Sequence, residues 1–472
     1  MKKSLAVNFL YTPKRHEYLY NSKFPYKLKR RDIVPKCNDI SHILGIKVKN
    51  LRITRELGLY FYKQTQCIFY EGHLTYKAKS CDLCGAQNEN ETVIKHGSRK
   101  TRVYMGLVFE RPAYLSLKKQ RFYCKACQRT YTAKTPYIRS RCRISTDVKL
   151  VITKKLAKMR SEKDIASDHF VSPSTVHRHL KYLAEEIKPN HKLPQYLSFD
   201  EFKSTNDVAS SMSFIYCDAV NHDIIEILPD RRKFKLEEHF LKFSPEERKR
   251  VKAVTMDMYQ PYMDLVEDLF PNAKIIIDRF HIVQAVNREI NRCRVRVMNQ
   301  FRTTEKRKYN KLKRYWKRLL ISPIDLDPIH YKSYRLFDFS QSEHSLVQYL
   351  INLDDLLHET YKVGHQILDA LRLNDINQLT YVLKNSKSKP ISKGLRRVMN
   401  TLIKYLPYIE HTIDHPQLTN GPLEGINNKI KLIKRVSYGY RNFESFKARI
   451  LIISRMFVSE YKKRTKQQTK VA

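Results

Sequence analysis

The sequence predicts a multidomain α+β protein, because three different patterns follow one another along its 472 residues. Two CxxC pairs come first, a helical stretch with a short turn comes second, and apolar runs that alternate with helical segments come third. A chain of this length can form two to four domains, each with its own core. The hydrophobic fraction of 42% is sufficient for folded domains rather than a disordered chain.

The charge balance predicts a partner with dense negative charge. Lys and Arg total 90 against 47 Asp and Glu, which gives a net charge of +43. Nucleic acid is the partner that such an excess favours. A ribosome-associated or membrane-surface protein is the alternative, but the chain has no lipidation motif and no run of 18 apolar residues. We therefore expect no membrane contact.

The cysteine content and the pattern of the first residues predict a cytoplasmic protein. Nine cysteines, four of them in CxxC pairs, fit a reducing compartment better than a disulfide scaffold. The first residues are basic, but the apolar stretch after them is too short for a signal peptide. Residues 1–75 are interpreted as a basic N-terminal region, and residues 461–472 as a basic tail.

Four cysteines predict a zinc ribbon over residues 76–135. Cys81 and Cys84 form one CxxC pair, Cys124 and Cys127 form the other, and 39 residues separate the two pairs. Two such pairs supply the four thiolates that one structural Zn²⁺ ion takes in tetrahedral coordination. Four free thiols are the alternative.

The pattern of residues 136–192 predicts a helix-turn-helix DNA-binding domain. A first helix over 161–170 precedes a short turn, and Ser172 and Pro173 favour the start of a second helix as its N-cap and first residue. Apolar residues in the second helix recur four apart and should face the core. An ordinary helical hairpin shares this pattern and is the alternative. The outward positions, where a recognition helix contacts bases and phosphates, are Ser174, Thr175, His177 and Arg178.

Five apolar runs beyond residue 193 predict a mixed sheet. Their order along the chain is three strands, a helix, a strand, a helix, a strand and a helix. This is the order of the ribonuclease H-like fold, and we expect the first part of such a catalytic domain over 193–283. The five runs are 196–200, 213–217, 224–228, 253–257 and 273–278.

Carboxylates stand at the ends of these runs. Asp200 ends the first run and Asp257 the fourth. Two strand-end carboxylates and an acid on a packed helix are the ligand set that two Mg²⁺ (or Mn²⁺) ions need for phosphoryl transfer. Glu201, next to Asp200, and Asp278, at the end of the last run, are competing candidates. Asp257 could instead cap the following helix.

The third acid is Glu424, near the start of a helix that follows Asn420-Gly421-Pro422. Isoleucines repeat along this helix at intervals of four and three and give it a core face. An acid near a helix start is also stabilised by the helix dipole regardless of function, which is the structural alternative. The other face, predicted to meet metal and then the DNA backbone, carries Glu424, Asn427, Asn428, Lys431 and Arg435.

These residues resemble the ISL-three family of bacterial insertion-sequence transposases, from about residue 40 to residue 454. The resemblance implies an Asp-Asp-Glu triad, which we assign to Asp200, Asp257 and Glu424. It rests on the paired CxxC and on the segments Leu197-Ser198-Phe199-Asp200-Glu201-Phe202, Thr255-Met256-Asp257-Met258-Tyr259-Gln260-Pro261-Tyr262, Asp278-Arg279-Phe280-His281 and Asn420-Gly421-Pro422-Leu423-Glu424-Gly425-Ile426-Asn427-Asn428-Lys429-Ile430-Lys431.

The element Asp278-Arg279-Phe280-His281 looks like one shared by transposases with a helical insertion before the glutamate. In those proteins it supports the active site, so the resemblance favours Asp257 over Asp278 as the second acid. His281 has a second interpretation, as a buried core histidine.

The resemblance also accounts for the 166 residues between Asp257 and Glu424 as a helical insertion over 284–415, after which residues 416–460 complete the ribonuclease H-like domain. The first third of the insertion is very basic, and Lys313 and Arg314 within it are predicted DNA contacts. A solvated helical face is the alternative to such a DNA clamp.

Two functions follow as expectations. The first is a transposase that binds the terminal inverted repeats of its element, cleaves at the ends and joins 3′-hydroxyls to target DNA. The second is a catalytically inactive zinc-ribbon and helix-turn-helix regulator derived from such an enzyme. The intact acidic set favours the first. Its expected partner is double-stranded DNA in the nucleoid, and pairing of two element ends predicts a homodimer or larger assembly.

Overall fold

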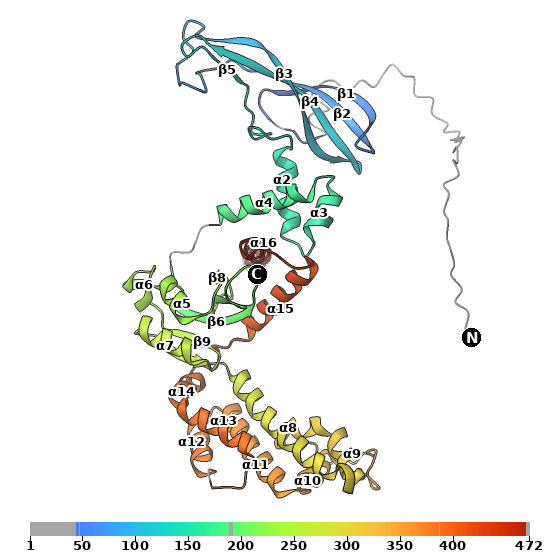
Figure 1. Ribbon diagram of the computed structural model, residues 1–472, viewed down its shortest axis with the longest axis vertical. Helices are drawn as coiled ribbons and strands as arrows, with labels where there is room; N and C mark the ends of the chain where they lie inside the picture. Colours follow the sequence, from blue (N-terminus) through green and yellow to red (C-terminus); the bar gives the residue numbers. More distant parts are fainter. Residues whose placement is uncertain (1–43, 47, 188–191, 387, 469–472) are drawn as a thin grey trace, which may run out of the picture. The chain divides into compact units, whose positions relative to one another are not determined.

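The computed structural model describes residues 44–46, 48–187, 192–386 and 388–468, and the chain divides into two units, Met1–Asp147 and Val148–Ala472 (Figure 1). Residues 1–43 of the predicted basic N-terminal region and residues 469–472 of the predicted basic tail lie outside the described residues. Within the described part of the chain, no helix is both long and apolar enough to cross a membrane.

The first unit is built on one five-stranded sheet. Its strands run in the order β1-β2-β4-β3, and β5 pairs with β4. β2 and β4 are parallel, and the other pairs are antiparallel. One face packs into a core that includes Ile53, Val103 and Leu115. The strands are β1 (Leu51–Tyr62), β2 (Thr65–Leu74), β3 (Val93–Val108), β4 (Arg111–Cys124) and β5 (Arg129–Thr132).

This sheet spans the predicted boundary between the basic N-terminal region and the zinc ribbon. β2 ends at Leu74, and its register with β4 joins residues before the boundary to the cysteine-bearing segment after it. The described part of 1–75 is therefore mostly strand, and it shares a core with residues 76–135. The pairing of β2 with β4 joins segments that are far apart in the sequence, so local sequence patterns do not reveal that the two regions share one sheet.

Three helices follow: α2 (Thr146–Leu156), α3 (Glu162–Asp168) and α4 (Pro173–Glu186). The Ser172 hydroxyl caps α4 by accepting a hydrogen bond from the Thr175 N–H at 3.3 Å, and Pro173 is the first helical residue. Val176 and Leu180 are completely buried. The predicted helices and the turn between them are thus observed, and the second helix continues six residues beyond Leu180.

The second unit contains a five-stranded mixed sheet with the order β10-β9-β6-β7-β8. β6, β9 and β10 are parallel to one another, whereas β7 and β8 are antiparallel to their neighbours. The strands are β6 (Tyr196–Lys203), β7 (Met212–Asp218), β8 (Ile224–Leu228), β9 (Ala253–Met256) and β10 (Lys274–Ile277); the helices between them are α5 (Lys233–Phe240), α6 (Pro245–Lys249) and α7 (Gln260–Leu269).

Alternation along the strands divides this sheet into two faces. Phe199 and Met256 pack on one face with residues of α5 and α7. Phe202 and Ile215 pack on the other face with two helices from the end of the chain. These helices are α15 (Gly421–Val436) and α16 (Phe443–Gln468), so the helix that carries Glu424 covers the face to which Asp200, two residues from Phe202, belongs. α16 runs through part of the predicted basic tail.

Seven α-helices and two short 3₁₀ helices lie between β10 and α15 among the described residues (Figure 1). α8 and α11 pack closely, and a Cβ added at Gly364 would lie 2.7 Å from Ile290 Cδ1, so a larger residue there would require the Ile290 side chain to shift. α14 returns the chain to the sheet, because the Thr412 hydroxyl accepts a hydrogen bond from the Ile277 N–H at 2.9 Å. The helices are α8 (Arg279–Thr304), α9 (Lys306–Arg314), η1 (Trp316–Leu320), η2 (Pro323–Asp325), α10 (Glu343–Ile351), α11 (Asp355–Arg372), α12 (Ile376–Asn385), α13 (Lys393–Lys404) and α14 (Leu406–Asp414).

Candidate functional site

The registers of the three parallel strands bring three aspartates into one row. β6 and β9 pair with Ser198 beside Thr255, and two further steps along both strands bring Asp200 level with Asp257. β9 and β10 pair with Met256 beside Ile277, so one further step brings Asp257 level with Asp278. Parallel strands are only about 4.8 Å apart. The carboxyl edge of this sheet therefore concentrates negative charge.

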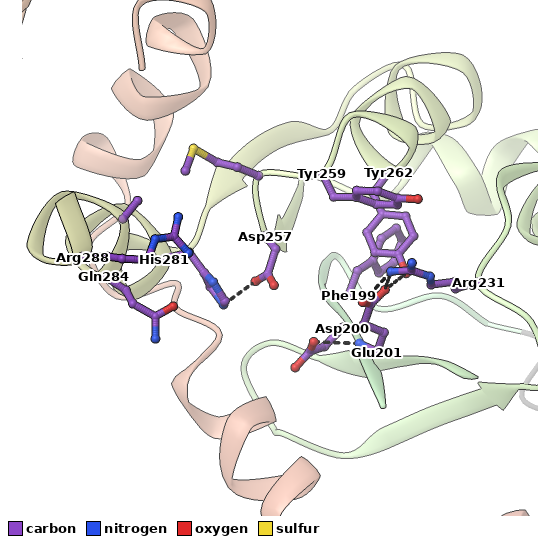
Figure 2. Close-up of a pocket in the computed structure, with 12 residues that line it drawn as sticks. Phe199, Asp200, Glu201, Arg231, Asp257, Tyr259, Tyr262, His281, Gln284 and Arg288 are labelled. Atoms are coloured by element: carbon purple, nitrogen blue, oxygen red, sulfur yellow. Dashed lines mark hydrogen bonds and ion pairs between the residues drawn. The ribbon is translucent and has the colours of Figure 1, made fainter. Parts of the chain in front are cut away.

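Asp200 and Asp257 line a pocket of about 300 Å³ at this edge, and their carboxylates point into the space between the strands and α8 (Figure 2). His281 projects from α8 towards Asp257 in the same view. The other lining residues are Phe199, Glu201, Arg231, Met258, Tyr259, Tyr262, Gln284, Ala285 and Arg288.

The Asp200 carboxylate is held from two sides. Its Oδ1 accepts a hydrogen bond from the Glu201 N–H at 2.7 Å, and its Oδ2 accepts one from the Asn427 side-chain amide at 2.7 Å. Burial, with a smaller contribution from the negative charge of Asp257, raises the pKa of Asp200 to about 6 against the opposing effect of the Glu201 N–H. A bound cation would relieve both costs, since it replaces lost hydration and screens the repulsion.

Asp257 and His281 form an ion pair, with Oδ1 and Nε2 2.9 Å apart. The hydrogen bond that the His281 ring donates to the Asp257 carboxylate raises the pKa of His281. The His281 side chain is 39% exposed, so the interpretation as a buried core histidine is wrong. Asp278 caps α8 by accepting a hydrogen bond from the Phe280 N–H at 3.2 Å, and burial raises its pKa.

Ligand atoms of Asp257, Asp278 and His281 lie within 4.8 Å of one another, close enough to hold one metal ion. The carboxylates suit magnesium or manganese, which prefer oxygen ligands. Glu424 is exposed on the first turn of α15 and does not line the pocket, but it is near enough for its charge to raise the pKa of Asp278. The structure thus groups Asp257, Asp278 and His281 closely, places Asp200 in the wall of the same pocket but outside this group, and sets Glu424 near Asp278.

Two asparagines fasten α15 to the acidic strands. Asn420 donates to the Phe199 carbonyl of β6 at 3.0 Å and accepts from the Thr255 hydroxyl of β9 at 3.0 Å. Asn427 is buried and donates to Asp200 and to the Glu201 carbonyl. Asn427 thus faces the carboxylate of a proposed metal ligand, and its burial means that it does so from inside the protein rather than from the surface. Asn420 and Asn427 are seven residues apart, which is about two helical turns, so both lie on the same side of the helix. This spacing is the sequence signal that could have identified them as a pair.

Glu201, the competing candidate next to Asp200, differs from Asp200 in its partners. Arg231 forms an ion pair with its carboxylate, and the Tyr262 hydroxyl donates to it at 3.2 Å. Its charge is therefore already compensated within the protein. The Asp200 carboxylate accepts hydrogen bonds from the Glu201 N–H and the Asn427 amide, which are both uncharged, so it is the member of the pair that a metal ion would satisfy.

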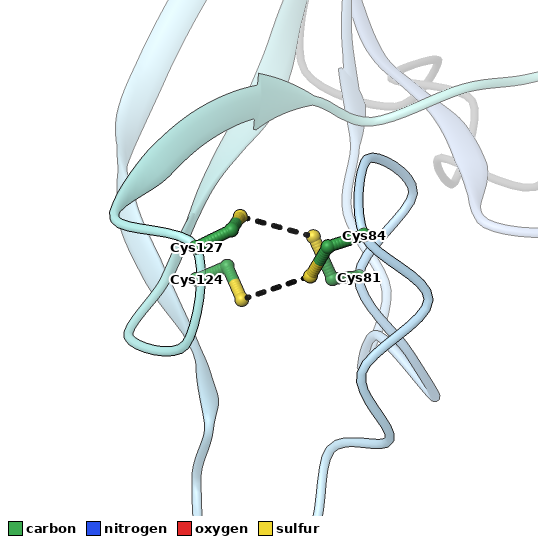
Figure 3. A group of neighbouring side chains, drawn as sticks. All are labelled: Cys81, Cys84, Cys124 and Cys127. Atoms are coloured by element: carbon green, nitrogen blue, oxygen red, sulfur yellow. Dashed lines mark hydrogen bonds between the residues drawn. The ribbon is translucent and has the colours of Figure 1, made fainter.

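The four predicted zinc ligands form a second cluster (Figure 3). Cys81 Sγ lies 3.8 Å from Cys127 Sγ, and Cys84 Sγ lies 3.8 Å from Cys124 Sγ. A tetrahedron with Zn–S bonds of about 2.3 Å has edges of about 3.8 Å, so these sulfurs already have the spacing that zinc requires. Burial opposes ionisation of the Cys81 thiol, but the backbone N–H groups of Leu83 and Cys84 outweigh it and lower its pKa to about 7.

The predicted recognition positions on α4 are not equivalent. Ser174 and Arg178 are exposed, Thr175 is half-buried, and the Arg178 Nε donates to the Ser174 carbonyl at 3.3 Å. His177 forms an ion pair with Glu162 of α3, with Nδ1 and Oε2 3.1 Å apart. It therefore contributes to the packing of α3 on α4 as well as to the outward face.

Some basic residues of α8 and α9 are buried in the protein, and others are exposed. Arg294 is buried and donates to the Leu312 carbonyl at 2.9 Å, and Lys311 is buried against Tyr349 with a hydrogen bond of 3.1 Å. Lys313 and Arg314, the predicted DNA contacts, are exposed at the end of α9. Lys431 and Arg435 are exposed on α15. Part of the cationic density in this region is thus structural.

Comparison with known proteins matches both units. Residues 197–450 match the ISL3 family described as transposase, and residues 77–127 match the ISL3 zinc ribbon described as the zinc-finger of transposase IS204/IS1001/IS1096/IS1165. The transposase for insertion sequence element IS1001 of Bordetella parapertussis is 26% identical over 378 residues, which cover 79% of this chain and 88% of that protein.

A shorter match is to an ATP-dependent protease of Lactococcus lactis subsp. lactis, 33% identical over 111 residues, which cover 24% of this chain and 35% of that protein. The match over residues 197–450 takes in the sheet, the helices after it and α15, more than half of the chain. The chain belongs to the ISL3 family of transposases.

Proposed function

We propose that this protein is a DNA transposase that binds the terminal inverted repeats of its element, cleaves at the ends and joins 3′-hydroxyls to target DNA by two-metal phosphoryl transfer. One observation carries the proposal. Asp200 lies within β6, which continues to Lys203, and Asp257 directly follows β9; the register of these parallel strands sets the two aspartates level, and Asn427 ties the helix of Glu424 to β6. Membership of the ISL3 family supports the same conclusion.

The strand order β10-β9-β6-β7-β8, with three parallel and two antiparallel strands, supports a ribonuclease H-like domain. In this assignment residues 193–283 and 416–460 form the domain, and residues 284–415 are a helical insertion. The contact of α14 with β10 supports the return of the chain to the sheet at the end of the insertion.

We assign metal binding to Asp200, Asp257 and Glu424, whose oxygens suit magnesium or manganese. When bound, two such ions supply activation of the attacking oxygen and stabilisation of the leaving oxygen. The protein residues orient these ligands. Asn427 directs the Asp200 carboxylate, and His281 holds that of Asp257. Asp278 and His281 have supporting roles at the start of α8.

Removing the charge of a proposed ligand should abolish chemistry without unfolding the protein. Asp200→Asn, Asp257→Asn and Glu424→Gln should each lower cleavage of labelled end DNA by at least about 100-fold with magnesium or manganese. Because the half-buried Asp200 carboxylate has a raised pKa, Asp200→Asn should also raise Tm at pH 8 in buffer without added divalent metal. Asp278→Asn should have a milder effect.

Asp218→Asn is the matched control, since Asp218 ends β7 outside the pocket and its side chain accepts hydrogen bonds that asparagine can also accept. It should cleave at the wild-type rate. Full cleavage by Asp257→Asn with none by Asp278→Asn would overturn the choice of Asp257 as the second acid. Full cleavage by Glu424→Gln would overturn the assignment of Glu424 as the third acid.

Asn427 is predicted to matter although it is not a metal ligand. Asn427→Ala removes the hydrogen bond that orients Asp200, and groups in this position typically contribute about 10- to 100-fold to metal affinity or activity. The magnesium concentration for half-maximal cleavage should rise, while affinity for end DNA is unchanged. Asn428→Ala, exposed on the next position of α15, should change either value by less than about twofold. Equal effects of the two substitutions would contradict this role.

We propose one structural zinc ion per chain, bound by Cys81, Cys84, Cys124 and Cys127. Cys81→Ser and Cys124→Ser should release about one zinc per chain by elemental analysis and should weaken end binding. Cys142→Ser removes a thiol of the same unit outside the cluster and should retain the metal. Freshly purified protein without zinc would refute the assignment.

We further propose that α3 and α4 are a helix-turn-helix that reads the element ends, and that the protein works as a homodimer or larger assembly on double-stranded DNA. Ser174→Ala with Arg178→Ala should reduce the preference for end DNA over random DNA. Lys313→Ala with Arg314→Ala should weaken binding to end DNA and to random DNA alike, because phosphate contacts carry no sequence information. The slope of log affinity against log salt concentration should fall by about two in magnitude, one for each lost contact. We assign Thr175, His177, Lys431 and Arg435 to the same DNA-contacting set. Identical effects of the two double variants on specific and random DNA would disprove the reading role.

A further inference from the structure

Two β-hairpin turns lie side by side at one end of the sheet in the first unit. β1 and β2 are joined at Lys63-Gln64, and β3 and β4 at Phe109-Glu110. Because β2 and β4 run parallel, both turns are at the same end, and the register of these strands continued backwards brings Gln64 level with Phe109. The four cysteines lie at the other end of β4.

This hairpin end, defined by Leu59, Tyr60, Phe61, Lys63, Phe109 and Arg111, holds large apolar side chains in solvent. Phe109 is 87% exposed, Phe61 76%, Tyr60 53% and Leu59 49%. On the face of β1 opposite Leu59 and Phe61, Tyr60 packs on Phe69, and the rings of Tyr62, Phe69 and Tyr114 pack on one another, which fixes the strand that carries Phe61. A group of exposed aromatic residues is typical of an interaction site.

Phe109 is also in an unfavourable backbone conformation. Its φ is 49° and that of Glu110 is 63°, so both residues of the turn are left-handed. Two-residue hairpin turns of this kind favour Asn-Gly, and a positive φ is an outlier for a bulky side chain. An exposed phenylalanine here stabilises neither the turn nor the core. Such a cost is typical of a residue that acts on a ligand.

The charge around these rings is positive. Lys63, Arg102 and Arg111 are exposed, and none of the three forms an ion pair with a described residue. The Arg102 guanidinium lies over the ring of Tyr62, 4.7 Å from its centroid. Residues 44–147 contain 21 Lys and Arg against seven Asp and Glu, of which Glu110 is at the turn itself. Aromatic rings among unpaired cations are complementary to bases and phosphates.

The strands at the sheet edges are poorly suited to pairing with another chain. β1 shifts register before Gly58, whose φ is 99°, and β3 shifts register before Gly106, whose φ is 105°. Bulges of this kind bend an edge strand and interrupt its ladder. The core of a protein interface is also depleted in charge, unlike this surface.

We propose that the hairpin end is a stacking platform for unpaired bases of DNA, with Phe61 and Phe109 contacting bases and Lys63 and Arg111 contacting the backbone. The inference rests on the proposed function for its ligand, DNA, and adds the class of DNA that the first unit recognises. An element end or target site whose bases are locally unpaired presents such a ligand during strand transfer.

The test compares two labelled duplexes of the same sequence, one blunt and one with a short single-stranded overhang, by fluorescence anisotropy with the full-length protein and no added magnesium. The wild-type protein should prefer the overhang by about 10-fold or more, as stacking of one or two bases provides. Phe61→Ser and Phe109→Asn should each reduce that preference severalfold and leave affinity for the blunt duplex unchanged. An overhang carrying 2-aminopurine should be quenched by the wild-type protein only.

Phe109→Asn separates a ligand-binding role from a structural one. Asparagine tolerates positive φ, so the turn should be equally or more stable, and Tm should not fall while overhang binding does. Phe339→Ala, a substitution of an 80% exposed phenylalanine in the other unit, should retain the preference for the overhang.

Equal affinity of the wild-type protein for both duplexes would overturn the proposal. So would a Phe109→Asn variant that keeps the preference, or one whose main defect is a lost dimer in sedimentation velocity, which would identify a second copy of the chain as the occupant. Cleavage does not enter these measurements, because no magnesium is added. Failure of the platform therefore leaves the cleavage proposal intact, and failure of cleavage leaves the platform testable.

Discussion

The register of three parallel strands is the constraint on which the proposed chemistry depends. It aligns Asp200, Asp257 and Asp278 at one edge of the sheet, where strands about 4.8 Å apart leave little room between carboxylates. Burial and mutual repulsion raise the pKa of Asp200 and of Asp278, so the folded chain carries an electrostatic cost at this edge. A bound divalent cation would offset that cost, so metal binding at this edge would also stabilise the fold.

The second requirement is that a distant segment returns to this edge. The chain leaves β10 into α8 and comes back only at α15, and Asn420 and Asn427 fasten that helix to both acidic strands. Each asparagine contacts β6, so a shift of α15 moves the Asp200 carboxylate as well as Glu424. The helices in between reach the sheet through Thr412. They are thus coupled to the row of aspartates through packing and hydrogen bonds.

Much of this arrangement was predictable because its signals are local. Alternating apolar residues marked the strands, Ser172 and Pro173 marked the start of α4, and the CxxC spacing marked the four cysteines. Long-range pairing was not predictable, so the strands of 1–75 were not assigned to the cysteine-bearing sheet. The helical pattern placed Asn427 on the polar face of its helix, but it could not identify Asp200 as the carboxylate to which the Asn427 amide donates. Arg449, which lies buried with hydrogen bonds to the Lys158 and Arg160 carbonyls, had no local signal at all.

The central claim is that the aligned aspartates and α15 bind divalent metal. Anomalous diffraction from crystals grown with manganese tests it most directly. We predict a peak about 2.1 Å from carboxylate oxygens of both Asp200 and Asp257, and a second peak that includes Glu424 when end DNA is bound. A peak held by Asp257, Asp278 and His281 without Asp200, or no peak at this edge of the sheet, would contradict the account.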